Sequence, residues 1–321
     1  MSDNSKIEWT DATWNPLRGI MGKWHCTKVS EGCQNCYAER MNMRFGGPEY
    51  RVGADEIRLD MDILSQPLRW KKPRLIFVCS MTDLFHEIVP FGYIGMIFDV
   101  MCDERCRQHT FQVLTKRPGR ALEFVQWLGE YWPGDTPLSV TWEVVGNFGE
   151  NIWFGVSVEN QKRADERISD LLNFPAAVRF VSAEPLLNGI DLSRITVKVD
   201  RGAYSLNALN GESWPFSIEA VYGSRLDWVI VGGESGPKAR PMHPDWARSI
   251  RDQCQAAGVQ FFFKQQGEWT PEYPQSLSMA NREMTYEHGM TFYRVGKKLA
   301  GRLLDGREWN EMPEKVRMRN E

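Results

Sequence analysis

Continuous apolar runs recur along the chain, with amphipathic stretches between them. Runs of this length without polar alternation are typical of strands that are buried on both faces, as in a parallel sheet. A further strand is expected over 10–17, which brings the total to about seven. The six clearest runs cover 74–79, 110–114, 151–158, 178–181, 228–231 and 259–263.

Between these runs, apolar residues repeat at helical spacing. The stripes cover 37–45, 121–128, 164–172 and 246–257, and the last ends at Gly258. Strands that alternate with helices in this number predict a complete or partial (β/α) TIM-like barrel of six to seven parallel strands. We expect the barrel to span 1–267, with an insertion over 188–227 after the fifth strand. Residues 268–321 are expected to form an extension that packs on the barrel, with a short hairpin over 290–304.

Composition places the chain among globular proteins, because 42% of its 321 residues are hydrophobic and 25% are charged. The net charge of −3 excludes a protein covered in basic charge, but it leaves room for a local basic cleft. The longest apolar stretch, 88–101, is interrupted by Pro90 and is shorter than the roughly 20 residues of a membrane span. The first residues do not form a secretory signal. We therefore expect a cytoplasmic protein with no membrane partner.

The cysteines are distributed unevenly. There are seven, and Cys26, Cys33 and Cys36 lie within one loop, 26–36. An odd number argues against a disulfide framework, whereas three clustered thiolates can ligate zinc or an iron–sulfur cluster. Structural zinc normally has four protein ligands, so three indicate a metal centre with one open position, such as a [4Fe–4S] cluster.

A metal site with four protein ligands remains an alternative. In it, Cys79 would complete a structural zinc site or a four-cysteine cluster. The remaining cysteines (Cys102, Cys106 and Cys254) lie in helical patterns, where a free thiol packs as a small hydrophobe.

Small, acidic or basic residues follow every predicted strand from the second to the seventh. In (β/α) barrels these carboxyl ends form the active-site face. Each residue also has a simpler interpretation as a helix cap or a surface ion-pair partner. The residues are Ser80, Thr82 and Asp83; Lys116 and Arg117; Ser157, Glu159 and Asn160; Glu184; Gly232, Gly233 and Glu234; and Lys264.

A cysteine loop after the first strand of a barrel resembles the radical S-adenosylmethionine (SAM) superfamily, although the first interval, of six residues, is longer here than usual. A similarity over most of the chain is to a phage-associated three-cysteine-motif family of unassigned function. It is carried by segments 7–16, 27–39, 155–160, 229–236 and 306–310.

The resemblance implies a role for each of these residues. Cys26, Cys33 and Cys36 would ligate a [4Fe–4S] cluster whose open iron binds SAM. The residues after the second strand (Ser80, Thr82, Asp83) would hold the SAM amino group, and those after the fourth (Ser157, Glu159, Asn160) the ribose or carboxylate. Gly232, Gly233 and Glu234 would lie against the adenine or the substrate, and Lys116, Arg117 or Lys264 would pair with a carboxylate or phosphate.

The implied reaction is reductive cleavage of SAM to methionine and a 5′-deoxyadenosyl radical, which abstracts hydrogen from a substrate. An electron-donor protein would be a partner. Nucleic acid repair or modification is an attractive role by analogy alone.

Two other functions compete with this one. The first is a metal-stabilised, non-enzymatic protein that binds nucleic acid or a partner through the aromatic and basic residues around the first cysteine (Lys23, Trp24, His25 and Lys28). The second is a barrel hydrolase that uses Glu159, Glu184 and Glu234 as acid and base. The hydrolase hypothesis leaves the cysteine cluster unexplained.

Overall fold

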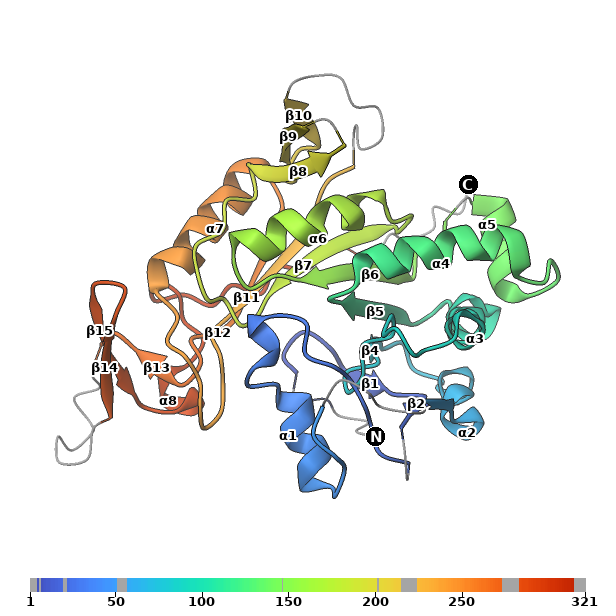
Figure 1. Ribbon diagram of the computed structural model, residues 1–321, viewed down its shortest axis with the longest axis horizontal. Coiled ribbons are helices and arrows are strands. Elements are labelled where there is room, and N and C mark those ends of the chain that lie inside the picture. Colours follow the sequence, from blue (N-terminus) through green and yellow to red (C-terminus); the bar gives the residue numbers. More distant parts are fainter. Residues whose placement is uncertain are drawn as a thin grey trace.

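A computed structural model describes residues 5, 7–19, 22–50, 57–145, 147–200, 202–214, 224–272 and 283–314. Within them, seven strands form one parallel sheet that curls into a half-barrel (Figure 1). The strands lie side by side in chain order, with only parallel pairing between neighbours. They are β1 (Ala12–Trp14), β4 (Leu75–Val78), β5 (Thr110–Thr115), β6 (Ile152–Ser157), β7 (Val178–Ala183), β11 (Trp228–Gly232) and β12 (Gln260–Gln265).

These strands confirm the predicted parallel sheet and a partial barrel. The continuous apolar runs of the sequence coincide with β4, β5, β6, β7, β11 and β12, because both faces of this sheet are covered. Among the described residues, no helix is both long enough and apolar enough to cross a membrane.

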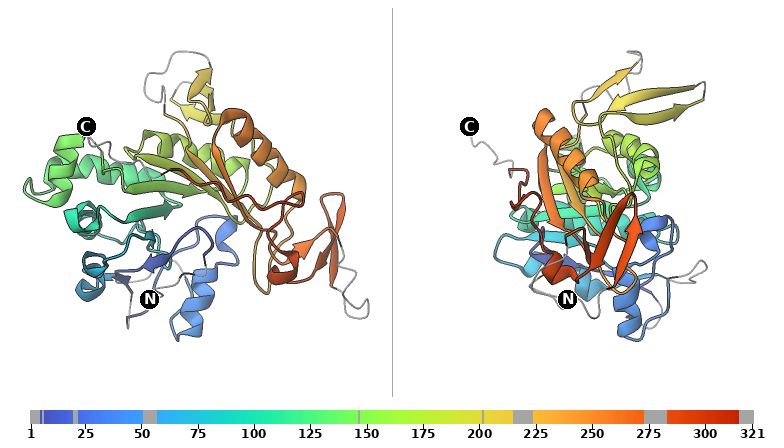
Figure 2. Two further views of the ribbon diagram at one scale, coloured as in Figure 1. Left: turned by 180° about the vertical axis from the view of Figure 1, so that it is seen from behind. Right: turned by 90° about the vertical axis from the view of Figure 1, so that its left-hand side faces the viewer.

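One face of the sheet is covered by helices (Figures 1 and 2). Helix α6 packs on β6 and β7, α7 packs on β11 and β12, and α4 packs on α6. Helix α7 ends at Gly258, whose φ of 67° is the left-handed conformation that glycine adopts most easily. The main helices are α3 (Phe91–Cys102), α4 (Pro118–Tyr131), α5 (Pro137–Val145), α6 (Gln161–Asn173) and α7 (Pro244–Ala257).

The other, concave face is filled by aromatic side chains. Trp9, which precedes β1, packs its ring 4.9 Å from Phe77 and 6.2 Å from Trp228. Trp153 and Phe180 belong to the same buried cluster. Large aromatic rings therefore fill most of the interior of the half-barrel, together with buried Gln112, which donates to the Trp9 carbonyl at 3.2 Å.

Two three-stranded antiparallel sheets and the antiparallel pair of β2 (Leu17–Arg18) and β3 (Arg58–Leu59) lie outside the half-barrel among the described residues. The first consists of β8 (Ile195–Val199), β9 (Gly202–Asn207) and β10 (Glu212–Trp214). It lies between β7 and β11 in the chain and projects from the half-barrel (Figure 2). The second consists of β13 (Trp269–Thr270), β14 (Met284–Glu287) and β15 (Met290–Arg294). The hairpin expected over 290–304 was misplaced, because the turn lies at His288–Gly289 and helix α8 (Lys297–Ala300) follows.

Short elements complete the fold near the N-terminus. They are β2 (Leu17–Arg18), α1 (Tyr37–Arg44), β3 (Arg58–Leu59), α2 (Met61–Leu64) and the 3₁₀ helices Glu31–Cys33, Pro67–Arg69 and Glu104–Cys106.

The last described segment pairs with the outer edge of β12. The Phe263 amide donates to the Trp309 carbonyl at 2.9 Å, and the Glu311 amide donates to the Phe261 carbonyl at 3.2 Å. Asn310 forms an antiparallel bridge with Phe262 between them. Residues 309–311 thus run along the half-barrel sheet.

Candidate functional site

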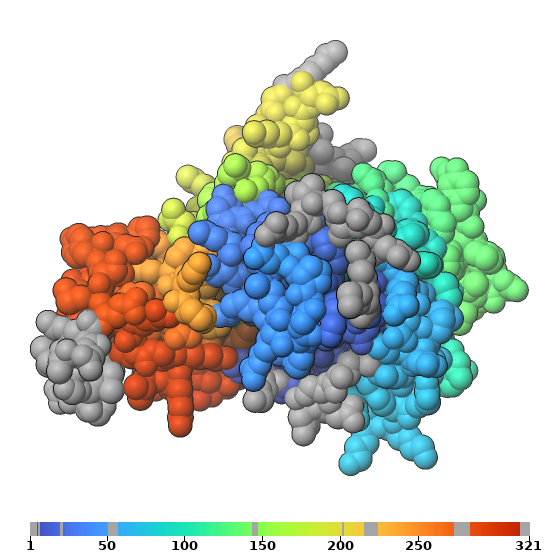
Figure 3. Space-filling model, turned by 60° about the horizontal axis from the view of Figure 1, so that its bottom comes forward, coloured from blue at the N-terminus to red at the C-terminus, as the bar shows by residue number. Residues whose placement is uncertain are grey.

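The cysteine loop, residues 26–36, lies over the carboxyl ends of the strands. It follows β2, passes through the 3₁₀ helix Glu31–Cys33 and ends at Cys36, the N-cap of α1. In the space-filling view, the first fifty residues (blue shades) fill the middle of one face, between the C-terminal part (orange and red) and the region of α2 (light blue) (Figure 3). Three polar anchors hold the loop to the sheet.

The first anchor is Glu159, which follows β6 and is fully buried. Its carboxylate accepts a hydrogen bond from Ser30 of the cysteine loop at 2.7 Å and one from Arg167 of α6 at 3.1 Å. Arg167 also donates to the Ser157 carbonyl at 2.7 Å. Gly32 packs so closely that a Cβ there would overlap the Glu159 carboxylate, so the loop needs glycine at this point.

The second anchor is Glu234, which follows β11. It accepts from the Asn35 amide at 3.0 Å and forms a bidentate pair with Arg240 at 2.6 and 2.8 Å. Arg240 also donates to the Glu31 carbonyl at 3.0 Å. Burial would raise the pKa of Glu234, but Arg240 and Asn35 outweigh it and hold the pKa below its usual value.

The third anchor is the buried pair of Asp83 and Arg117, whose charged groups lie 3.0 Å apart. Arg117 donates to the Thr27 hydroxyl of the loop at 2.7 Å, and Asp83 accepts from the Thr115 hydroxyl at 2.7 Å. Burial opposes the charge of Asp83, but Arg117 and these donors keep its pKa below the usual value.

The thiols are half-buried, with charged groups of both signs around them. Burial and the neighbouring Asp83 carboxylate raise the pKa of Cys26 to about 12, whereas Arg117 and the Asp83 backbone N–H act against that rise. Burial also raises the pKa of Cys36, whose sulfur accepts from backbone N–H groups in the first turn of α1. Lys116 interacts electrostatically with Cys33 and Cys36. These donors and cations are the partners that a metal-bound thiolate needs.

Electrostatic interactions link the three thiols in pairs, Cys26 with Cys36 and Cys36 with Cys33. Among the described residues, no three side chains of His, Cys, Asp or Glu form a ready-made metal-ligand group. Three buried polar atoms close to this loop in sequence or packing have no hydrogen-bond partner: Trp24 Nε1, His25 Nε2 and Thr82 Oγ1. In its chemistry, this set of thiols and unused donors fits a thiolate-bound cluster with a polar ligand.

Cys79 packs in a different apolar cluster from the loop cysteines. It is buried in the main hydrophobic core with φ of 54°, and its surroundings include the Leu17 backbone and Asp83. Cys26 and Cys36 instead pack in a separate apolar cluster around Tyr50. Asp83 nevertheless interacts electrostatically with both Cys79 and Cys26. The other three cysteines (Cys102, Cys106 and Cys254) are buried in the main core, as expected for packing residues.

The remaining predicted residues divide into two groups. Near the loop, Ser80 exchanges hydrogen bonds with Asn15, while its carbonyl accepts from Tyr37 at 2.7 Å. Farther along the sheet, Asn160 caps α6 by accepting from the Arg163 amide, and Lys264 pairs with Glu184 at 2.7 Å.

The two glycines after β11 differ from each other. Gly232 has ordinary space around it, with the nearest atoms 3.4 Å from a built Cβ. Gly233 approaches the next strand end, and a Cβ there would overlap the Gln266 carbonyl. The sequence predicted that the backbone at Gly232 and Gly233 approaches a ligand closely. The close approach in the structure is between Gly233 and Gln266 of the same chain.

Sequence reasoning missed the side chains that fasten the loop, namely Ser30, Asn35, Arg167 and Arg240. One signal was present for Arg167, because it lies on the same helical face as Ala164 and Leu171, both buried. A charged residue within an apolar stripe requires a buried partner. The other three are ordinary polar loop residues in the sequence.

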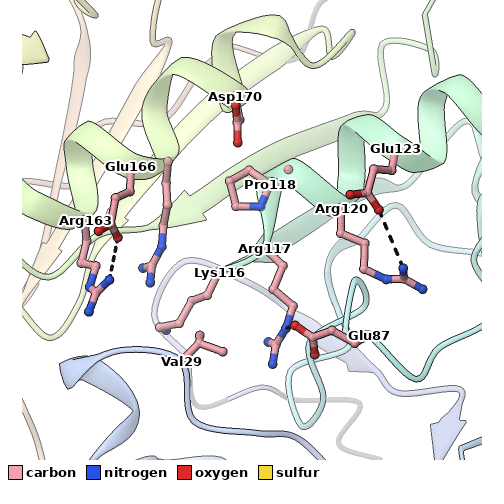
Figure 4. Close-up of a pocket in the computed structure, with 12 residues that line it drawn as sticks. Val29, Glu87, Lys116, Arg117, Pro118, Arg120, Glu123, Arg163, Glu166 and Asp170 are labelled. Atoms are coloured by element: carbon pink, nitrogen blue, oxygen red, sulfur yellow. Dashed lines mark hydrogen bonds and ion pairs between the residues drawn. The ribbon is translucent and has the colours of Figure 1, made fainter. Parts of the chain in front are cut away.

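A cleft of about 460 Å³ adjoins the cysteine loop (Figure 4). Val29 of the loop lines one wall, residues 116–120 after β5 form its centre, and α6 contributes Arg163, Glu166, Arg167 and Asp170. Glu87 and Glu123 complete the lining.

The fold and site together define an α/β half-barrel protein with a thiol-rich loop at the strand ends. The chain belongs to a family of proteins of unknown function, DUF5131, whose family model matches residues 4–313. No curated protein and no solved structure matches it.

Proposed function

We propose that this protein is an iron–sulfur enzyme of the radical SAM type, in which Cys26, Cys33 and Cys36 hold a [4Fe–4S] cluster. Such a cluster, when bound, supplies the electron that splits SAM and so starts hydrogen abstraction from a substrate. The observation that carries the proposal is the position of the three thiols, which are fastened by buried polar anchors to the carboxyl ends of parallel strands. In barrel folds that edge carries the chemistry.

The chain's own residues would prepare the site. Lys116 and Arg117 would offset the negative charge of the thiolates, because each interacts with cysteines of the loop. Thr82, whose buried hydroxyl has no partner, supplies a hydrogen-bonding group for a polar ligand after β4. The anchors Glu159 and Glu234 would keep the loop closed over the strand ends and limit access of water.

The competing functions receive less support. For a hydrolase, the three glutamates would need to be available as acid and base. Instead, Glu159, Glu184 and Glu234 each pair with a cation. For base stacking, Trp24 offers at most one face, because the Arg18 guanidinium lies over the other, 4.7 Å from the ring centroid, and Phe45 packs edge-on beside the ring.

Anaerobic reconstitution with iron and sulfide, followed by absorption and electron paramagnetic resonance spectroscopy and a SAM-cleavage assay, tests the proposal. We expect a reducible cluster whose spectrum changes on addition of SAM, and release of methionine and 5′-deoxyadenosine. A colourless protein that holds stoichiometric zinc would overturn the proposal in favour of a metal-stabilised binding protein. A reducible cluster whose spectrum does not change on addition of SAM would overturn the proposal that the protein uses SAM.

A further inference from the structure

The apolar stripe of helix α1 faces outward. The sequence pattern over 37–45 predicts an amphipathic helix, whose apolar face normally covers the core. In the structure, the side chains that α1 buries are Ala38, Glu39 and Asn42. Its large apolar side chains are instead between 38% and 53% exposed, and the helix projects from the half-barrel (Figures 1 and 3). They are Tyr37, Met41, Met43 and Phe45.

Three of these side chains lie along one face of the helix. Tyr37, Met41 and Phe45 are spaced by four residues, so they occupy consecutive turns over about 12 Å. Arg40 and Arg44 flank them, because residues three and four positions apart are neighbours on a helix. These five residues are called the α1 surface below. Aromatic rings, methionine and arginine are the side chains that are enriched where proteins bind other proteins.

The α1 surface has a positive edge. Lys23 and Arg40 donate to backbone carbonyls, and the carboxyl groups nearby have partners of their own, since Glu39 pairs with Lys28 at 2.7 Å and Glu49 also interacts elsewhere. A cation at the last turn of α1 also offsets the helix dipole, but that role needs no apolar neighbour. The surface therefore matches an acidic partner. The cations that form no ion pair with a carboxylate of a described residue are Lys23, Arg40 and Arg44.

The α1 surface begins beside the cysteine loop. Cys36 is the N-cap of α1, and Tyr37 is the next residue. The ring of Tyr37 is 44% exposed, but its hydroxyl reaches inward, where it donates to the Ser80 carbonyl at 2.7 Å and interacts electrostatically with Cys36. A protein seated on the α1 surface would therefore touch a side chain that is in direct contact with the surroundings of the thiols.

We propose that the α1 surface docks a small acidic electron-carrier protein of the ferredoxin or flavodoxin class. This rests on the proposed function, because a cluster that gives an electron to SAM must receive another before the next cleavage. In the transfer, one electron leaves the carrier, which is oxidised, and enters the cluster held by the three thiols, which is reduced. No bond forms or breaks in this step.

A single-stranded nucleic acid is the other class of molecule that binds exposed rings and cations. The exposed thioethers of Met41 and Met43 favour a protein instead, because methionine adapts its shape to irregular apolar surfaces.

Calorimetric titration of the purified full-length chain, before and after anaerobic iron–sulfur reconstitution, tests the docking. The probes are an acidic ferredoxin, an acidic flavodoxin and a short oligothymidylate. We expect a carrier to bind, and its binding to weaken as salt screens the exposed charges. Met41→Gln should weaken that binding by about threefold to tenfold. Arg44→Glu should weaken it by about tenfold at low salt.

Matched controls lie far from the α1 surface. Met284 is 53% exposed on β14, so Met284→Gln makes the same change elsewhere. Arg107 is exposed and precedes β5, at the amino ends of the parallel strands, so Arg107→Glu makes the same charge reversal at the opposite edge of the sheet. Both controls should leave carrier binding unchanged, and thermal unfolding checks that all four variants fold.

Stopped-flow reduction of the reconstituted protein gives a second readout. Met41→Gln and Arg44→Glu should slow reduction by the reduced carrier by the same factors as they weaken binding. Reduction by dithionite should stay unchanged, because a small reductant needs no docking surface.

Failure of both carriers to bind, or unaltered carrier binding in both α1 variants, would overturn the proposal. Oligothymidylate that binds more tightly than either carrier, and loses that binding in the same variants, would overturn it in favour of a nucleic acid. Carrier binding by a chain that forms no cluster would leave the docking surface standing while the proposed function fails. SAM cleavage with dithionite in a chain that binds neither carrier would do the reverse, so the two failures are distinguishable.

Discussion

Ser30 donates a hydrogen bond of 2.7 Å to Glu159, a residue 129 positions later in the chain. The same carboxylate neutralises Arg167, so one buried group serves both the cysteine loop and helix α6. Several consequences of this arrangement can be measured.

Glu159→Gln should lower the free energy of unfolding by about 3–5 kcal/mol. The amide still accepts from Ser30, but it leaves the Arg167 guanidinium buried without a counter-charge. Urea denaturation measures the loss. In the control Glu283→Gln, the pair is exposed and the loss should stay below about 1 kcal/mol. Equal losses in the two variants would contradict a buried ionic anchor at Glu159.

Cys26→Ala, Cys33→Ala and Cys36→Ala should each prevent stable iron binding, whereas Cys79→Ala should retain it. Cys79 packs in the main core, so its truncation should cost only about 1 kcal/mol of stability. The iron and sulfide content per chain after reconstitution measures the difference, and thermal unfolding checks that each variant folds. Loss of iron in Cys79→Ala to the same extent would restore the four-cysteine alternative.

Gly233→Ala should destabilise the protein by about 1–3 kcal/mol, because its methyl group would overlap the Gln266 carbonyl and force the strand ends apart. The adjacent Gly232→Ala is the matched control. Its methyl group would meet side-chain atoms no closer than 3.4 Å, so the change should stay below about 1 kcal/mol. The difference in melting temperature between the two variants measures the extra loss of stability in Gly233→Ala. Equal melting temperatures would argue against close packing at Gly233.

Asp99 should make stability fall as the pH rises. Burial raises the pKa of Asp99 above its ordinary value of 3.8, so the folded state binds the proton more tightly than the unfolded chain. The stability linked to that proton is present below the unfolded pKa and is lost as the pH rises through the folded pKa.

Asp99→Asn, which retains an acceptor for the Leu138 amide, should abolish this dependence. It should also gain up to about 1 kcal/mol at neutral pH. Denaturation curves across the acidic range measure the slope, and an unchanged slope in the variant would assign the pH dependence to other groups.

The sheet could be predicted because its strands are covered on both faces. Runs such as 228–231 are continuously apolar. A short run of this kind between two predicted helices is most simply a strand that is buried on both faces. The insertion strands β8, β9 and β10 gave no such signal, because polar residues on their exposed faces interrupt the apolar pattern, as at Thr196 and Lys198 of β8. The C-terminal hairpin was displaced along the sequence for a different reason. In β14 the apolar residues Met284 and Tyr286 are exposed, so the sequence pattern does not show which face is covered.

The candidate site could be predicted in outline, since polar residues at neighbouring strand ends must lie along one edge. The sequence could not predict which of these strand-end residues form hydrogen bonds with the cysteine loop. Asn35 and Glu234, for example, are 199 residues apart, and neither residue type specifies the other. Such contacts depend on the path of the loop over the sheet, which a single sequence does not encode locally.

The pairing of residues 309–311 with β12 gives the C-terminus a protective role. An unpaired strand at the edge of a parallel sheet offers its amides and carbonyls to any other chain. A chain that ends before Trp309 should therefore self-associate through the exposed backbone of Phe261 and Phe263, which light scattering would detect. Residues 309–311, near the end of the family match, thus cover the outer edge of β12.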